Sequence, residues 1–149
     1  MDVCTFLAHA VKLELETEEA YLKLVELMKV LGNHDAAEFF GEMAGFCSLH
    51  RDTAMRRAGF DDSTDIHGIV ASWPGSNTET PNLKDSEGPF DLDGVMSLAH
   101  AAEMCAVVFY EEIARTTADL QIRLHAEEFA AEERGHALAI ERFFGRKPY

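Results

Sequence analysis

The chain has 149 residues, of which 47% are hydrophobic, so it is long enough for one domain with a buried core. Its formal net charge of −14 argues against nucleic acid and anionic membranes as partners, because phosphate groups are bound by clustered Lys and Arg. Cys4, Cys47 and Cys105 form no CxxC pair, and the chain begins without a basic or long apolar leader. We therefore expect a reducing, cytoplasmic location, with neither a signal peptide nor a membrane span.

The first part of the chain predicts two long helices. Apolar residues recur at helical spacing over residues 3–31, and a Gly-Asn pair then ends the pattern. Asp35 is expected to cap a second helix over residues 35–58, with Phe46 among its apolar positions.

Residues 60–91 change character, because Pro, Gly, Ser, Thr and Asp become frequent and rule out a continuous helix. This length suits a crossover that travels along a bundle, so that the third long helix starts at the same end as the first and runs parallel to it. Ile66, Ile69 and Val70, with Trp73, are expected to dock against the bundle through a short helix.

The last part of the chain predicts two more long helices, over residues 93–117 and 119–145, capped by Asp93 and Asp119. The apolar positions of the final helix include Leu120, Leu124 and Leu138. The expected fold class is all-α: a four-helix bundle in a single domain spanning 1–149, with one long crossover between helices two and three.

A repeat relates the two halves of the chain. Glu14 is followed seven residues later by Tyr21, and the same pattern recurs 89 residues on as Glu103 and Tyr110. Seven residues are two helical turns, so each Glu shares a helix face with its Tyr. A carboxylate in such an apolar stripe needs a partner, because a buried unpaired charge costs several kcal/mol, and a metal ion supplies one.

A second pair of motifs strengthens the metal hypothesis. Cys47-Ser-Leu-His50 and Glu133-Arg-Gly-His136 lie 86 residues apart, which predicts a turn three residues shorter in the second half. One carboxylate on each of two helices, with Glu-x-x-His on the other two, forms the di-iron site of a helical bundle. Cys47 occupies the one position without its expected ligand. The predicted ligands, converging on one interior point, are Glu14, His50, Glu103, Glu133 and His136.

Three other histidines have weaker signals. His9 and His125 are expected at the surface or near helix ends. His100 lies one turn before Glu103 on the same face and is a candidate extra ligand.

The four predicted long helices resemble those of a known family, and two segments carry the resemblance most clearly. Leu98-Ala-His-Ala-Ala-Glu103 through Phe109-Tyr110-Glu-Glu-Ile-Ala114 is similar to helix three of the rubrerythrin and bacterioferritin branch of the ferritin-like superfamily. Phe129-Ala-Ala-Glu-Glu133-Arg-Gly-His136 is similar to helix four of that branch. The resemblance covers nearly the whole chain outside residues 60–91, and it implies a ferritin-like bundle.

The resemblance also implies roles for individual residues. Glu14 and Glu103 would be terminal carboxylates, and Glu133 would be a bridging carboxylate. His50 and His136 would be the two imidazole ligands. Tyr21 and Tyr110 would hydrogen bond to the bridging ligands across the bundle and orient them.

This sequence departs from the family pattern in two ways. No rubredoxin-like domain with paired CxxC motifs follows the bundle, so no internal electron donor is expected. Cys47 stands where the second bridging Glu is expected, and one soft sulfur does not reproduce a carboxylate bridge between ferric ions. Three outcomes stay open: an asymmetric two-iron site, a one-metal site, or a vestigial site in which Cys47 is a small core residue.

The function implied is that of a non-haem iron oxidoreductase, acting in peroxide reduction, dioxygen reaction or Fe(II) oxidation. Its cofactor would be two iron ions, or one iron or zinc ion if Cys47 fails to bridge. Its partners would be a small oxidant, a separate electron donor and a second copy in a homodimer. The alternative is a degenerate bundle with a one-metal or empty site, acting as a structural or interaction module.

Overall fold

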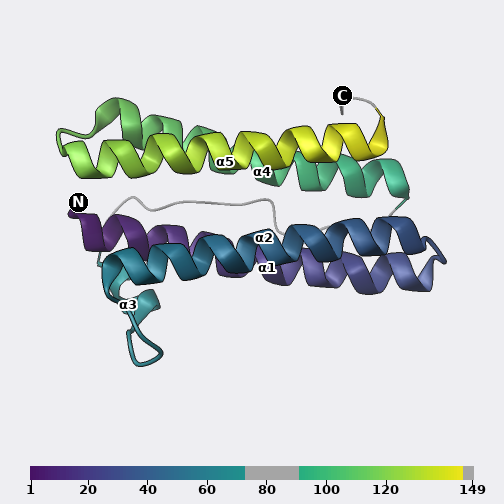
Figure 1. Cartoon of the computed structure of the whole chain (residues 1–149), viewed down its shortest axis with the longest axis horizontal. Coiled ribbons are helices and arrows are strands. Elements are labelled where there is room, and N and C mark those ends of the chain that lie inside the picture. The colour runs from purple at the N-terminus through teal and green to yellow at the C-terminus, as the bar shows by residue number, and fades with distance from the viewer. Residues whose placement is uncertain (73–90, 146–149) are drawn as a thin grey trace. The chain divides into compact units, whose positions relative to one another are not determined.

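The computed structural model describes residues 1–72 and 91–145, and within these residues it contains helices and no strand (Figure 1). The all-α fold class is therefore confirmed. The helices are α1 (Val3–Val30), α2 (His34–Ala58), α3 (Ile66–Ala71), α4 (Leu92–Thr116) and α5 (Leu120–Phe144). Each long helix begins and ends within one residue of the range expected from the sequence.

The caps of two helices differ from the prediction. Asn33, not Asp35, caps α2 by accepting a hydrogen bond from the Ala36 amide. Asp91, not Asp93, caps α4 through the Gly94 amide at 2.7 Å. The two predicted caps lie instead in the first turns of these helices, where a negative charge is favourable beside the positive end of the helix dipole.

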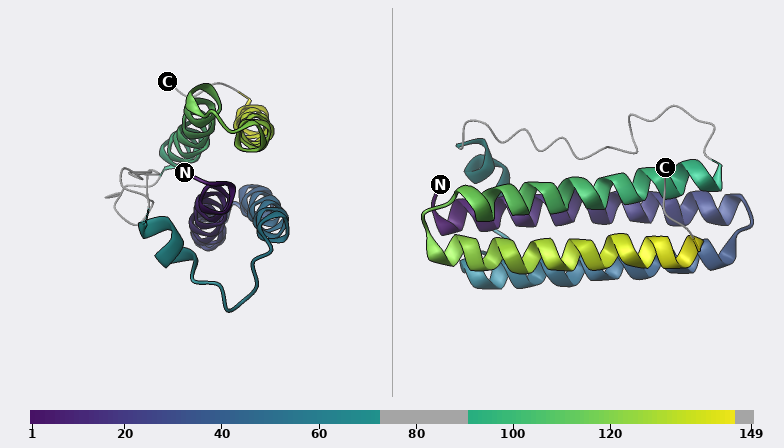
Figure 2. Two further views of the ribbon diagram at one scale, coloured as in Figure 1. Left: turned by 90° about the vertical axis from the view of Figure 1, so that its left-hand side faces the viewer. Right: turned by 90° about the horizontal axis from the view of Figure 1, so that it is seen from above.

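The chain forms two compact units, Met1–Asn77 and Thr78–Tyr149. The first contains the α1–α2 hairpin, with α3 packed on α1, and the second contains the α4–α5 hairpin. Figure 2 shows the two helices of each hairpin side by side. A single domain over 1–149, and a parallel arrangement of the first and third long helices, stay predictions.

The two hairpin turns have equal length, which corrects one expectation. Residues 31–33 link α1 to α2, and residues 117–119 link α4 to α5. The three-residue difference between the repeats lies in the helices, because α1 has 28 residues and α4 has 25. The extra residues all follow Glu14, so the first hairpin is longer on that side of its carboxylate.

The predicted short helix in the crossover is present as α3. Val70 is buried, while Ile66 and Ile69 are partly exposed. These residues dock a six-residue helix against α1, as the apolar pattern predicted. Trp73 lies outside the described residues.

Four residues at the predicted apolar positions are exposed in the structure. They are Phe46, Leu120, Leu124 and Leu138. In α5 the buried face is made by Ile122, Phe129 and Ile140 together with alanines and two of the predicted ligands. The buried face of α5 contains polar and small residues, while the exposed face contains leucines. The hydropathy of the sequence therefore does not predict which face of α5 is buried.

Among the described residues, α4 is long and apolar enough to cross a membrane by length and composition alone. Its most apolar 18-residue window has a mean hydropathy of 1.4. The core helix of a folded bundle passes the same test, and α4 carries the buried carboxylate of Glu103.

His9 is buried in α1 with 3% of its surface exposed, although the sequence suggested a surface or helix-end position. Burial lowers its pKa to about 4, and the nearby positive charge of Lys12 adds to this effect. The neutral imidazole is therefore the form that the fold accommodates.

We predict that His9 makes the protein sensitive to acid. Above about pH 6.5 the imidazole is neutral in both states, whereas between about pH 6.5 and pH 4 only the unfolded chain binds a proton. The free energy of unfolding should therefore fall by about 3 kcal/mol across this window because of His9. Urea unfolding of His9→Gln should show a smaller loss, whereas His67→Gln, at an exposed position, should behave like the parent. Equal losses in all three proteins would contradict this.

Candidate metal centre

The second unit brings three of the predicted ligands together. Glu103 lies on α4 with 2% of its surface exposed, and Glu133 and His136 lie one turn apart on the facing side of α5. Nδ1 of His136 is 3.3 Å from Oε2 of Glu133 and 3.5 Å from Oε2 of Glu103. Two carboxylates and one imidazole thus form a buried cluster that could hold a metal ion.

The pKa values within this cluster are strongly shifted. Burial raises the pKa of Glu103 to about 8, and the neighbouring Glu133 carboxylate adds to the rise. Burial disfavours the charged form of His136, but Glu103 and Glu133 outweigh it and raise its pKa to about 10. Without a cation, protons therefore balance the negative charge of the two carboxylates near neutral pH.

The first unit contains the matching pair. Glu14 on α1 is buried, and its Oε1 lies 3.8 Å from Nδ1 of His50 on α2. Cys47 lies one turn before His50 and is 1% exposed. The repeat predicted from sequence therefore gives each hairpin a carboxylate close to an imidazole. Convergence of all five ligands on one point stays a prediction.

The two predicted tyrosines are buried at matching places. Tyr21 stacks on Phe40 of α2 with ring centroids 5.9 Å apart. Tyr110 meets Phe129 of α5 edge to face at 5.5 Å. These aromatic contacts pack each Tyr between the helices of its own hairpin and fix the ring. The hydrogen bonds from the two tyrosines to bridging ligands stay a prediction.

The structure adds ion pairs between helices that the sequence did not reveal. Arg51 on α2 pairs with Glu18 on α1, four residues after Glu14. Arg134 on α5, beside Glu133, pairs with Glu111 on α4. Each pair ties together the two helices that supply ligands. Sequence spacing reports neighbours within one helix, whereas these contacts depend on the register of two helices.

His100, the candidate extra ligand, bonds to another residue. Its Nε2 lies 3.2 Å from Oε1 of Glu141 on α5, and both side chains are largely covered. His125, expected near the surface, is partly buried and stacks on Phe129 at 6.1 Å. His100 therefore bonds to a residue outside the cluster around His136, and His125 packs against an aromatic ring.

The chain is similar to a protein of known structure. No family model and no curated protein matches the chain. The crystal structure of an uncharacterized conserved protein from Magnetospirillum magnetotacticum MS-1 is similar, with a TM-score of 0.78 and 27% sequence identity. The match covers 100% of this chain and 97% of that one. It supports the predicted fold class, an all-α helical bundle of ferritin-like type.

We predict that Glu103→Gln stabilises the metal-free protein. The raised pKa of Glu103 means that its contribution to stability is complete below about pH 4.5 and is lost as the pH rises through about 8. The neutral amide lacks this titration. The gain in free energy of unfolding should therefore grow between these pH values, as measured by urea unfolding in the presence of a chelator.

Glu127→Gln provides the control, because Glu127 is exposed on α5. It should unfold like the parent at each pH. A gain from Glu103→Gln that stays constant with pH would show that the Glu103 carboxyl does not carry the burial cost.

Proposed function

We propose that this protein is a non-haem iron oxidoreductase of rubrerythrin-like type, acting on peroxide or dioxygen or oxidising Fe(II). The observation that carries the proposal is the matched pair of carboxylate–imidazole contacts. Glu103 and Glu133 lie against His136 in one hairpin, and Glu14 lies near His50 in the other. These contacts are not part of an acidic protein surface, because their carboxylates are buried.

The donor set in the second unit suits iron. Two carboxylate oxygens and one imidazole nitrogen are ligands that iron accepts, and burial would limit competition from water. Glu103, Glu133 and His136 would hold one ion, and Glu14 and His50 would complete the site. Bound iron would supply electrons to the oxidant and would itself be oxidised from Fe(II) to Fe(III).

Side chains of the protein would bind and release the protons that accompany metal binding and oxidant reduction. Glu103 and His136 have raised pKa values, so the metal-free cluster carries protons that a cation would displace. Tyr21 and Tyr110 would orient the ligands through hydrogen bonds. The buried apolar faces around the cluster would exclude bulk water, so only a small oxidant would enter.

Cys47 makes the two hairpins unequal. Its sulfur occupies the position that corresponds to Glu133, and it is buried. A thiolate favours a softer or borderline ion, so we propose that Cys47 lowers occupancy at one metal position or changes the identity of the ion there. Zinc would be held there more readily than a second ferric ion.

The other parts of the proposal follow from the same assignment. Electrons would come from a separate donor protein or small molecule, and the reaction would take place in the cytoplasm. The substitution at Cys47 also favours a second candidate, a metal-poor bundle that serves as a structural or interaction module. Iron content after aerobic purification from iron-supplied cells separates the two candidates.

We predict that His136→Ala or Glu133→Ala abolishes metal uptake, because both residues serve the one-metal and the two-metal forms of the site. Iron per chain would be measured by mass spectrometry after anaerobic loading with Fe(II) and desalting. His100→Ala is the matched control, since it removes a largely covered imidazole that bonds to Glu141. Full iron occupancy in Glu133→Ala would refute the ligand assignment.

We predict that Cys47→Glu raises bound iron towards two per chain and increases peroxide turnover. The new carboxylate would supply the bridging oxygens that sulfur lacks. Cys47→Ala separates the roles of the sulfur, because it removes the thiol without adding a ligand. If Cys47→Glu bound no more iron than the parent while Cys47→Ala lost all activity, the thiol would be the reactive group.

A further inference from the structure

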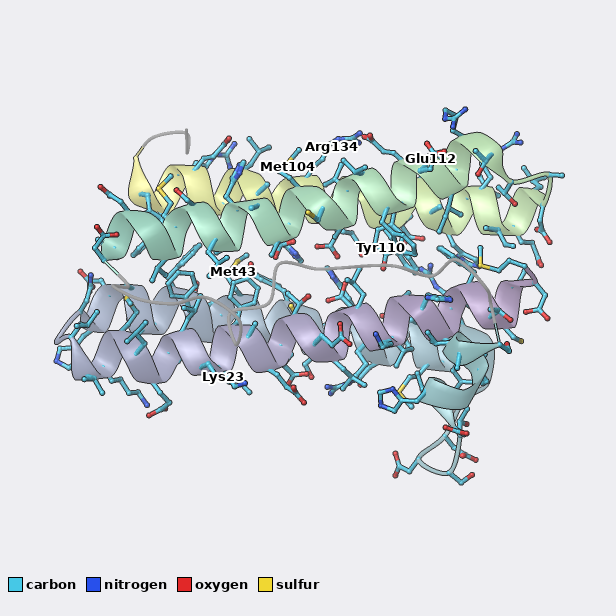
Figure 3. The ribbon with its side chains drawn as sticks, turned by 180° about the vertical axis from the view of Figure 1, so that it is seen from behind. Lys23, Met43, Met104, Tyr110, Glu112 and Arg134 are labelled. Atoms are coloured by element: carbon cyan, nitrogen blue, oxygen red, sulfur yellow. The ribbon has the colours of Figure 1, made fainter. Side chains whose placement is uncertain are left out.

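One face of α4 is apolar and exposed. The most apolar 18-residue window of this helix is only 33% buried. Its exposed residues include Ala101, Met104, Cys105 and Val108, with Val108 61% exposed. At spacings of three or four they form one stripe, here called the α4 stripe. Figure 3 shows Met104 on the edge of the hairpin opposite Tyr110.

The α4 stripe is also free of charge. Residues 95–110 contain no Lys or Arg, and their one carboxylate, Glu103, is buried. The rest of the chain is strongly acidic, with a formal net charge of −14. Two copies of such a protein repel one another over most of their surfaces, so an uncharged apolar stripe is where they can approach.

We propose that the α4 stripe binds the α4 stripe of a second copy of this chain, with the two helices antiparallel about a two-fold axis near Met104 and Cys105. A two-fold contact uses the same surface on both copies. Ala101 would then lie level with Val108 of the second copy. The proposal concerns the outer face of α4 and does not depend on the metal site.

The charges at the ends of α4 fit this arrangement. Asp93 and Arg115 lie on opposite sides of Met104, each eleven residues away, which is about 17 Å along a helix. In the register that sets Ala101 level with Val108, Arg115 therefore lies within one residue, about 1.5 Å, of the level of Asp93 of the second copy, at both ends of the contact. Arg115 is exposed and pairs with Glu112 in its own helix, where it is held near this position.

The exposed apolar residues of α2 fit a second copy less well. Phe46 and Leu49 are exposed near the middle of that helix. Glu42 and Asp52 lie five residues on either side of Cys47, and both are exposed acids. Antiparallel pairing about Cys47 would set these like charges level with one another, which is destabilising. It would also set Arg56 level with Glu38, both exposed, so α2 offers mixed charges where α4 offers an uncharged stretch.

Sedimentation velocity of the full chain over a range of concentrations tests the proposal. The parent should form dimers, and Val108→Glu should weaken dimerisation at least tenfold by placing two carboxylates at the contact. Leu138→Glu is the matched control, because Leu138 is exposed on α5 outside the α4 stripe. A parent that stays monomeric up to on the order of 0.1 mM, beyond the range of a weak small interface, would overturn the proposal. Equal weakening by both variants would also overturn it.

Charge reversal provides a test that misfolding cannot mimic. Asp93→Arg and Arg115→Asp should each weaken dimerisation. The double variant should recover most of the lost affinity, because its arginine and aspartate form the same ion pair with the positions exchanged. Additive losses in the double variant would contradict the antiparallel register.

Thiol crosslinking checks the position of the two-fold axis. With copper(II) phenanthroline as oxidant, two Cys105 thiols lose two protons and two electrons and form one disulfide between copies. Cys105→Ser should abolish rapid crosslinking, whereas Cys4→Ser, at the other exposed cysteine, should leave it unchanged. Crosslinking that depends on Cys4 would overturn the proposed axis.

Co-sedimentation of the parent, and not of Val108→Glu, with neutral phosphatidylcholine vesicles would overturn the proposal in favour of a membrane surface.

Discussion

Buried carboxylates are the constraint on which the rest of this structure depends. Glu103 is almost fully enclosed, and the neighbouring Glu133 makes its ionised form more costly. A helix core of small and apolar residues would be simpler to build and more stable without them. The imidazole of His136 offsets part of the cost, with contacts of 3.3 and 3.5 Å to the two carboxylates. A site that keeps such groups inside the fold is consistent with binding a cation.

The duplication gives the two hairpins the same kinds of ligand, with one difference between them. In both hairpins a carboxylate on the first helix lies near an imidazole on the second. The first hairpin has the thiol of Cys47 where the second has Glu133. Sulfur and carboxylate differ in hardness and in the number of donor atoms, so the two metal positions would differ in affinity.

Helix α4 combines two different surfaces. Its inner face carries Glu103 and Tyr110, whose burial between helices defines the candidate site. Its outer face carries Met104 and Val108, which are exposed and uncharged. A helix with an apolar outer face gains by binding another apolar surface. The inner face would hold the metal, and the outer face would hold the second copy.

The sequence by itself determined the helices, the repeat and the identity of the candidate ligands. Helical periodicity and spacing within one helix depend on local geometry, which is why Glu133 and His136 could be paired from their spacing alone. Tertiary structure alone decided that His9 is buried, that Leu138 is exposed, and that His100 bonds to Glu141. These outcomes depend on the rotation and register of one helix against another, and both faces of α5 carry apolar residues, so hydropathy does not select between them.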